Sequence, residues 1–445
     1  MVRTLALILL SFISAGCQSE LGTLKINWKR HTLSNGLRVV LVEDHSVPLI
    51  SYQTWVGVGS VNEEEGKTGL AHFFEHLMFK GTEKYPGRKF FEKLEMQGAE
   101  VNASTSRDTT TFYENFSPHL LDTVIDLESD RFQNLLIDEE RMQVEKAVVL
   151  EERKLRVESQ PASRMQEALW STVFRQHPYS HPVSGWPEDI IKFKTEDLKK
   201  FFAQYYTPKN VVIVVVGDLD SAVVIKKIEQ GYGSWQDRSE RKPLEIEFEP
   251  EQTGERRWTL TDGVTSEQLV MGYPISSADQ KDSFVLDLLS GILFSGESSR
   301  AHQKCVEKEQ LALSVSGSAY TPKYPGLFSS HVVMKPGISI SKAEACIETL
   351  LLDFKKELVT QGELNRVRKQ FLVSTLDGVK TPYGLGQWIG TVTVMFDDPG
   401  RFISDYQKYE TITPEDIKRV AIKYFDSNQR SVITLTPRVA ITKAK

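Results

Sequence analysis

The sequence is poor in cysteine, with three in 445 residues. Cys305 and Cys346 lack the spacing of structural zinc ligands, which excludes a cysteine zinc site in that half of the chain. In an oxidising compartment the two could form a disulfide, and two buried free thiols are an equally good interpretation. Cys17 is the third cysteine, and its surroundings point to a different role.

The chain also lacks a large excess of charge of either sign and several common sequence motifs. A net charge of −6 gives no reason to expect a nucleic-acid partner. No low-complexity tract, glycine-rich phosphate loop or serine or cysteine nucleophile elbow is present. The hydrophobic content of 40% is ample for two cores, and the length of 445 residues suits two domains.

The N-terminus has the form of a bacterial lipoprotein signal. Arg3 precedes the apolar stretch Leu5 to Ile13, and Ser14-Ala15-Gly16-Cys17 follows as a lipobox, although Ser14 is a less usual residue there. We expect residues 1–16 to be removed and Cys17 to carry the lipid anchor, with a plain secretory signal as the alternative. Gln18 favours the outer membrane. No later stretch is apolar enough to span a bilayer, so the body is expected in the periplasm.

The most informative segment is 69–82, GLAHFFEHLMFKGT, which contains His-x-x-Glu-His. On a helix His72 and His76 stand one turn apart on one face, where both imidazoles can reach one metal ion, and Glu75 shares that face. The order is that of the inverzincins. Two solvated histidines are the alternative, but the apolar residues around them predict a buried helix, in which these groups need partners.

A zinc hydrolase needs a third protein ligand and an open position for water. Residues 138–157 have acidic side chains early and basic ones late, as suits a helix dipole. Glu145 and Glu152 lie seven residues apart and share one face of that helix. Glutamates on a helix are usually just solvated, so the residues alone leave both interpretations open.

The chain resembles the pitrilysin family, and within it the branch of mitochondrial processing peptidase-like subunits with two domains. The segments that carry the resemblance are 69–82, Gly98 to Thr105, Glu145 with Glu152, Leu288-Leu289-Ser290 and Ser298-Ser299-Arg300. The resemblance implies that Glu152, which lies 76 residues after His76, is the third zinc ligand and that Glu145 is a supporting residue. Glu151 is then a neighbour without a role.

These assignments imply a zinc metalloendopeptidase with one Zn²⁺ per chain. Zinc held by His72, His76 and Glu152 would polarise the scissile carbonyl and acidify a water molecule, and Glu75 would act as the general base. The segment 100–116 is rich in threonine and aromatic residues and predicts strand structure. By resemblance its edge receives an extended peptide substrate, with Asn102 and Ala103 lining the cleft.

The two halves of the chain look like copies. Glu196 to Phe201 and Tyr205-Tyr206 recur as Glu415 to Val420 and Tyr424-Phe425, and a β-branched run follows each copy. A weaker similarity between the two halves links Asn35-Gly36 with Asp262-Gly263, and each of these pairs predicts a hairpin turn. We expect an α+β fold of two homologous domains, each a largely antiparallel sheet packed with helices. The expected units are a zinc-binding domain at 17–238, a linker at 239–256 and a domain without metal ligands at 257–445.

One departure from the family affects the functional prediction. Self-sufficient relatives carry an Arg and a Tyr in the second half that bind substrate, and the matching positions here are Val306 and Leu313. We therefore expect the chain to be the zinc subunit of a heterodimer whose homologous partner supplies the Arg/Tyr pair. The alternative is that the loop around Val306 and Leu313 is divergent and that another residue, such as Tyr320, binds substrate in place of the pair. The alternative function is that of a non-catalytic structural or binding subunit.

Overall fold

A computed structural model gives the structure of the protein and describes residues 26–87, 89–237 and 245–438. The first half contains strands β1 (Trp28–Thr32), β2 (Arg38–Glu43), β3 (Ile50–Val56), β4 (Glu100–Thr105), β5 (Thr110–Phe116) and β6 (Val211–Gly217). Its helices are α1 (Leu70–Leu77), α2 (Lys89–Glu95), α3 (Leu121–Asn134), α4 (Glu139–Arg153), α5 (Pro161–Val173), α6 (Pro187–Lys192), α7 (Thr195–Tyr205) and α8 (Ser221–Tyr232), with a π-helical segment η4 (Lys154–Glu158) after α4.

The second half contains strands β7 (Arg256–Asp262), β8 (Gln268–Ile275), β9 (Ala312–Tyr320), β10 (Gly326–Met334) and β11 (Ser431–Pro437). Its helices are α9 (Lys281–Phe294), α10 (Ile340–Lys356), α11 (Gln361–Gly378), α12 (Pro382–Phe396), α13 (Arg401–Glu410) and α14 (Pro414–Tyr424), with a π-helical segment η7 (His302–Lys308) between α9 and β9.

Each half builds one sheet, and the two sheets share a strand order apart from β1, which extends the first sheet by one strand. The first runs β1-β2-β6-β3-β5-β4 and the second β7-β11-β8-β10-β9. In each sheet one neighbouring pair is parallel, β2 with β6 and β7 with β11, and the other pairs are antiparallel. The α+β fold of two similar, largely antiparallel domains is therefore confirmed.

The internal repeat is confirmed where it was strongest. The repeated segments form α7 followed by β6 and α14 followed by β11, and β6 and β11 occupy matching places in the two sheets. The hairpin turn predicted from the weaker similarity is wrong for the second half. Asn35-Gly36 does turn the β1–β2 hairpin, but Asp262-Gly263 joins β7 to β8, and β11 lies between those two strands. The Asx-Gly signal cannot tell whether the strands beside it pair with each other.

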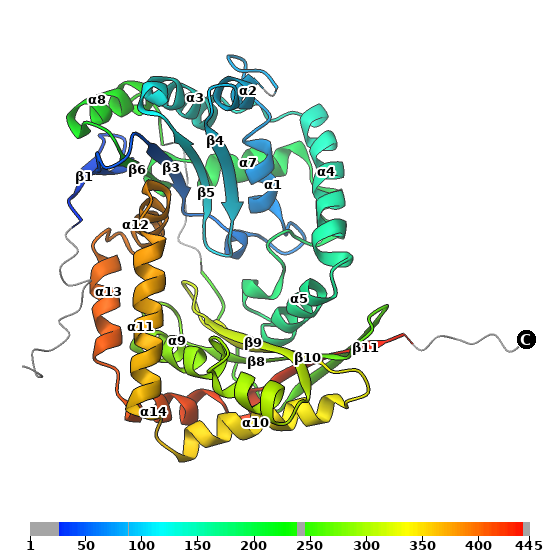
Figure 1. Ribbon diagram of the computed structural model, residues 1–445. Helices are drawn as coiled ribbons and strands as arrows, with labels where there is room; N and C mark the ends of the chain where they lie inside the picture. The colour runs from blue at the N-terminus through cyan, green and yellow to red at the C-terminus, as the bar shows by residue number, and fades with distance from the viewer. Residues whose placement is uncertain (1–25, 88, 238–244, 439–445) are drawn as a thin grey trace, which may run out of the picture.

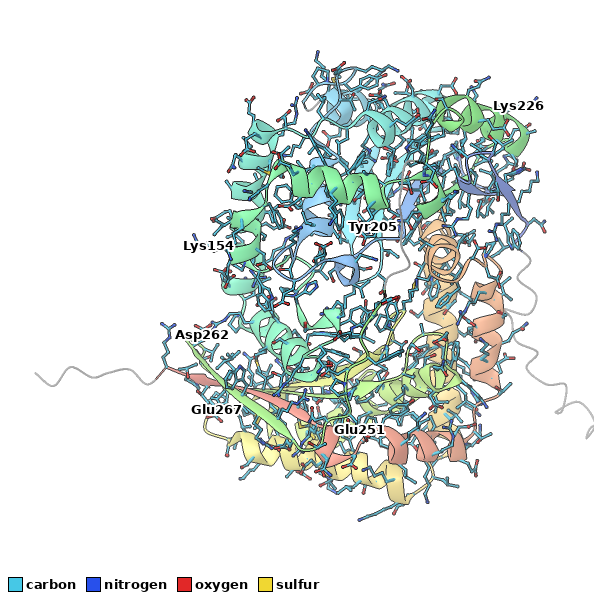
Figure 2. All side chains as sticks on the ribbon, turned by 180° about the vertical axis from the view of Figure 1, so that it is seen from behind. Lys154, Tyr205, Lys226, Glu251, Asp262 and Glu267 are labelled. Carbon is cyan, nitrogen blue, oxygen red and sulfur yellow. A yellow bond between two sulfur atoms is a disulfide. The ribbon has the colours of Figure 1, made fainter. Side chains whose placement is uncertain are left out.

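Each half also contributes a helix to the sheet of the other half (Figure 1). Helix α12 of the second half covers β3 and β6 of the first sheet, where Leu385 and Ile389 pack against Trp55 and Val214. Helix α5 of the first half covers β8 and β11 of the second sheet, where Leu169 packs against Val270 and Ile433. In the view from behind, Lys154 lies where α4 ends and the chain continues towards α5, which covers the second sheet (Figure 2). The exchange couples the stability of the two halves.

Two further contacts fix the second half and the segment that leads into it. Cys305 of η7 and Cys346 of α10 form a disulfide, so of the two interpretations left open the structure has the paired one. The described part of the expected linker is 245–256, of which 245–255 has no helix or strand and Arg256 already belongs to β7. The segment is nevertheless held in place. Glu249 accepts hydrogen bonds from the N–H groups of Arg175, Gln176 and His177.

The expected signal peptide and Cys17 lie outside the described residues, as do residues 239–244 of the expected linker. Within the described part of the chain, no helix combines the length and apolar character needed to cross a bilayer.

The helix exchange predicts that truncating Ile389 weakens the first domain. Ile389→Ala should lower the free energy of unfolding by about 2–5 kcal/mol, because it leaves a cavity in a buried cluster. Hydrogen exchange should become faster in β3 and β6, although the change lies in the second half. Val373→Ala, at a side chain that is 57% exposed on α11, is the control and should change the unfolding free energy by less than about 0.5 kcal/mol. Unchanged exchange in β3 and β6 would contradict the coupling.

Candidate metal centre and active site

The start of α1 is fixed by a buried carboxylate and by two glycines. Glu63 accepts hydrogen bonds from the N–H groups of Gly69 (2.7 Å) and Ala71 (2.8 Å). Gly69 has φ +95°, and a Cβ there would lie 2.9 Å from the Cα of Gly185. Gly185 has φ +74°, and a Cβ there would meet the carbonyl oxygen of Thr68 at 2.3 Å. Because both residues are glycines, the backbone around Gly185 can pack directly against the start of α1. This contact and the hydrogen bonds to Glu63 fix the position of the N-terminal end of the helix.

The two histidines of α1 face Glu152 of α4. His76 Nε2 lies 2.9 Å and His72 Nε2 lies 3.7 Å from Glu152 Oε2. One ligand atom from each of the three residues falls within 4.8 Å of the others, and no other such cluster occurs in the described part of the chain. Two imidazole nitrogens and one carboxylate oxygen form the donor set of a catalytic zinc site. The three side chains are between 13% and 20% exposed, which leaves room for a further ligand. The residues therefore fit Zn²⁺.

Glu145 contacts His76 at Nδ1, the ring nitrogen that does not face Glu152. Its Oε1 lies 2.9 Å from His76 Nδ1, and its Oε2 lies 2.6 Å from Lys80 Nζ. When Nδ1 carries the proton, Nε2 presents its lone pair towards Glu152 and His72. The hydrogen bonds from His76 and Lys80 lower the pKa of Glu145 although burial works against this, so the carboxylate stays charged. The side chain of Glu145 is 1% exposed, and it contacts the ring nitrogen of His76 that does not face Glu152.

His72, His76 and Glu152 are called the metal cluster here because they could hold one ion. Glu75 lies beside this cluster and is not part of it. Thr105 of β4 donates a hydrogen bond to Glu75 Oε2 at 2.6 Å. Burial raises the pKa of Glu75, while the bond from Thr105 lowers it. A carboxylate with a raised pKa is a stronger proton acceptor, which suits a general base. Burial and the neighbouring His76 lower the pKa of His72 to about 4, so this imidazole is neutral near pH 7 and can ligate a metal.

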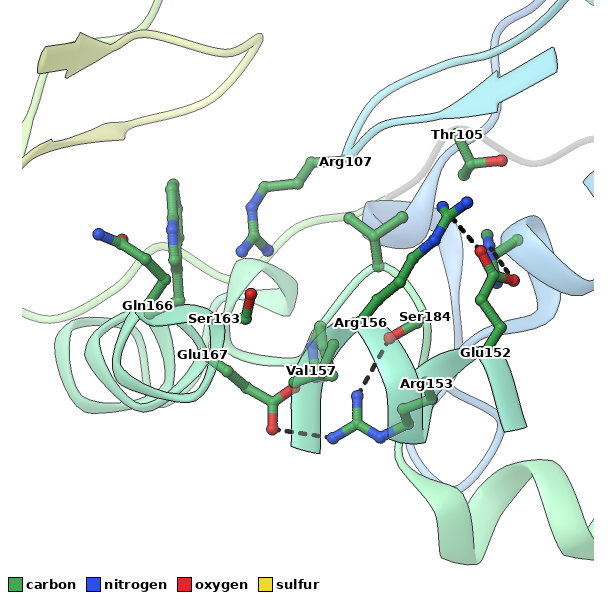
Figure 3. A pocket seen from close by; sticks show the side chains of 14 residues that line it. Thr105, Arg107, Glu152, Arg153, Arg156, Val157, Ser163, Gln166, Glu167 and Ser184 are labelled. Atoms are coloured by element: carbon green, nitrogen blue, oxygen red, sulfur yellow. Dashed lines mark hydrogen bonds and ion pairs between the residues drawn. The ribbon is translucent and has the colours of Figure 1, made fainter. Parts of the chain in front are cut away.

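Two cavities adjoin the cluster, one on each side. The first, of about 580 Å³, is lined by Glu75, His76, Asn102 and Ala103, among others. The second, of about 370 Å³, lies between α4, α5 and β4 and has His72 and Glu152 in its wall (Figure 3). β4 is the last strand of its sheet, so its outer edge pairs with no other strand of the described residues. The structure therefore places Asn102 and Ala103 on an open edge beside the metal cluster.

Several residues near this cluster were not predicted from the sequence, namely Lys80, Arg156, Thr105 and Arg107. Arg156 Nη1 lies 2.7 Å from Glu152 Oε1, so both oxygens of this carboxylate are engaged. Lys80 and Arg156 each stand four residues after a site residue, a spacing that could have suggested them. Thr105 and Arg107 reach the site through the β4–β5 hairpin, and no local signal in the sequence points to them. Glu151 is 59% exposed and lies away from the cluster.

The second half adds no residue to the walls of the two cavities as far as the chain is described. Val306 lies on η7 and packs against the core of its own domain. Leu313 lies on β9 and is 55% exposed. Tyr320 comes closer, because its ring makes an edge contact with Trp170, which lines the smaller cavity, with centroids 5.8 Å apart.

Comparison with known proteins agrees with this geometry. Residues 38–185 match the family "Insulinase (Peptidase family M16)", and residues 192–371 match "Peptidase M16 inactive domain". The zinc protease PqqE of Helicobacter pylori is 31% identical over 413 residues, 91% of this chain and 92% of that protein. The chain belongs to the M16 peptidase family. The expected pitrilysin-type relationship is thereby confirmed at the level of the family.

Other relatives fit the same assignment. The probable mitochondrial-processing peptidase subunit beta of Arabidopsis thaliana is 25% identical over 91% of this chain and 78% of that protein. The crystal structure of a protease from Helicobacter pylori superposes with a TM-score of 0.88 at 29% identity, over 93% of this chain and 100% of that one. Several M16 relatives of this chain are named zinc proteases, so zinc is supported for the family.

The contact between Glu145 and His76 predicts a role in metal affinity. Glu145→Gln should weaken zinc binding by about 10- to 100-fold, because His76 loses the charged partner that orients its ring. Competition with a chelating dye measures this affinity. Glu151→Gln is the matched control on the same helix, and its affinity should equal that of the unchanged protein. Equal affinity for both variants would show that Glu145 does not support the site.

Proposed function

We propose that this protein is a zinc metalloendopeptidase that hydrolyses peptides or unfolded protein segments, with one Zn²⁺ per chain. The observation that carries the proposal is the cluster of His72, His76 and Glu152 with Glu75 beside it. Degenerate family members would be expected to lose one of these four residues, and this M16 chain has kept them all.

The residues of the site have separate roles in this proposal. His72, His76 and Glu152 hold the zinc ion, which when bound supplies a Lewis acid for the scissile carbonyl and acidifies a water molecule. Glu75 takes the proton at its carboxylate and returns it to the leaving amine. Thr105 orients Glu75 through Oε2, which leaves Oε1 for the proton.

The unpaired edge of β4 is the proposed place for the substrate. An extended peptide can add to an edge strand by main-chain hydrogen bonds, which give affinity with little side-chain selectivity. Asn102 and Ala103 lie on this edge and line the larger cavity next to Glu75. A peptide that pairs with β4 would pass beside the metal cluster.

We further propose that the chain is the zinc subunit of a heterodimer. Val306 and Leu313 offer no hydrogen-bond donor, and the walls of both cavities come from residues 72–184 in the described chain. A homologous partner with the Arg/Tyr pair would complete the site. The contact of Tyr320 with Trp170 supports the alternative of a self-sufficient chain. The match of the second half to a family named an inactive domain keeps a structural or binding subunit as the other function.

The proposed location is the bacterial envelope, with a lipid on Cys17 holding the protein at the membrane, and the outer membrane as the expected one. The lipobox Ser14-Ala15-Gly16-Cys17 supports this proposal. The disulfide between Cys305 and Cys346 supports it as well, because such bonds persist in oxidising compartments.

The role of Glu75 predicts a separation of metal binding from activity. Glu75→Gln should keep zinc, because Glu75 is outside the ligand cluster, and should lower cleavage of a quenched unstructured peptide by about 100-fold or more. His76→Ala should lose both zinc and cleavage. Metal analysis and the peptide assay are run on the same samples. Normal cleavage by zinc-loaded Glu75→Gln would show that the role is wrong.

The heterodimer proposal predicts that the partner restores activity. The purified chain should bind zinc and cleave the peptide poorly alone, and adding a homologous chain with the Arg/Tyr pair should raise kcat/KM. The same mixture with Glu75→Gln in this chain is the control and should stay inactive. Full activity of the single chain would exclude the heterodimer, and Tyr320→Phe would then test the alternative.

A further inference from the structure

The smaller cavity beside the metal cluster contains an excess of positive charge. Its wall includes three arginines, Arg107, Arg153 and Arg156, and two carboxylates, Glu152 and Glu167. Arg153 Nη2 donates to Glu167 at 2.8 Å, and Arg156 is bonded to Glu152. Both carboxylates are therefore already paired with an arginine. Arg107 is left as the arginine of this wall that pairs with neither carboxylate.

Arg107 is buried without an acidic hydrogen-bond partner in the described structure. Its side chain sits over the ring of Trp170 at 3.8 Å, and its Nη1 donates to the carbonyl oxygens of Tyr179 (2.7 Å) and His181 (3.1 Å). The residue is 8% exposed. Asp108 is the acidic side chain whose charge acts on Arg107, but its two oxygens accept from the Tyr179 hydroxyl and the Lys323 N–H.

The charge of Arg107 is therefore incompletely balanced within the chain. Burial lowers its pKa to about 10, so the guanidinium is still charged at neutral pH. Both backbone hydrogen bonds use Nη1, and the guanidinium points into the cavity towards Ser163 of α5 (Figure 3). A buried guanidinium with free donors favours a planar anion, above all a carboxylate.

We propose that this cavity is a substrate subsite for an acidic residue, Asp or Glu, next to the scissile bond, and that Arg107 determines this specificity. The proposal rests on the proposed peptidase function, since it names the substrate class of the same site. His72 and Glu152 form part of the cavity wall, so a side chain bound there belongs to a residue close to the metal cluster. Ser163 and Gln166 offer further hydrogen bonds from α5. A glutamine in place of the glutamate would leave the charge of Arg107 unbalanced.

A purely structural role of Arg107 is the competing explanation, because its bonds to Tyr179 and His181 hold that loop. The two explanations predict different results. A structural residue affects all peptides alike, whereas a specificity residue changes the ratio between an acidic peptide and its amide isostere. The test therefore measures a ratio and does not depend on turnover.

The experiment uses zinc-loaded Glu75→Gln protein mixed with the homologous chain that carries the Arg/Tyr pair, and fluorescein-labelled peptides in an otherwise Ser/Ala sequence. One Glu is moved through successive positions, and each peptide has a matched Gln version. Anisotropy should show about 10- to 100-fold tighter binding of the Glu peptide at one position, as expected for a hydrogen-bonded charge pair. Adding Arg107→Gln should remove this preference. Adding Arg438→Gln, which removes a charge from the exposed residue just after β11, should not.

A second variant covers the case in which loss of Arg107 disturbs folding. Gln166→Glu keeps Arg107 and its backbone bonds but places a carboxylate in the cavity. It should abolish the preference for Glu while binding of the Gln peptides stays the same. Equal binding of Glu and Gln peptides at all positions, or no binding of either, would overturn the proposal. So would a preference that persists in both variants.

Failure of the proposed function would be seen in a different measurement. A chain that binds no zinc, or that cleaves no peptide even with its partner, would contradict the peptidase proposal. A chain that binds zinc and cleaves with dependence on Glu75, but without any preference for Glu over Gln, would contradict the subsite alone.

Discussion

The contact between α1 and α4 is the constraint on which the site depends. α1 provides His72, Glu75 and His76, and α4 provides Glu145 and Glu152. Neither helix carries a complete site, so a small sliding of one helix along the other would separate the ligand atoms. Glu145 lies in this contact and is almost fully buried, where it bonds both His76 and Lys80 across the interface. A buried carboxylate of this kind needs both partners, and it therefore fixes the register of the two helices.

The surrounding fold keeps both helices in place. Glu63 and the contact of Gly69 with Gly185 set where α1 begins, and Asp138 caps the start of α4 by accepting from the N–H of Arg141. After Glu152 the chain enters a π-helical segment and then α5, which crosses to the second sheet. The segment that carries Glu152 is thus tied to the other half of the molecule. Helix α12 makes the reciprocal contact, so the two halves hold each other around the site.

The sequence predicted much of the fold and the main residues of the site, because these depend on local patterns. The histidines and glutamates follow helical spacing, and α7–β6 and α14–β11 recur with the same residue types. The sequence did not predict that α5 and α12 exchange sheets, because an apolar helix face does not specify which sheet it will cover. Arg107 and Thr105 were missed for a related reason. They reach the metal cluster through a hairpin and long-range packing, which spacing along the chain does not reveal.

The atoms that coordinate the metal decide whether His72, His76 and Glu152 are its ligands. Zinc K-edge X-ray absorption on the purified chain reports the type and distance of the atoms around the metal. We expect one zinc per chain with two imidazole nitrogens and carboxylate or water oxygens at about 2.0–2.2 Å, and no sulfur. Glu152→Ala should remove an oxygen ligand and leave both imidazoles. A sulfur ligand, a site with fewer than two imidazoles, or a spectrum unchanged by Glu152→Ala would contradict the assignment of His72, His76 and Glu152 as the zinc ligands.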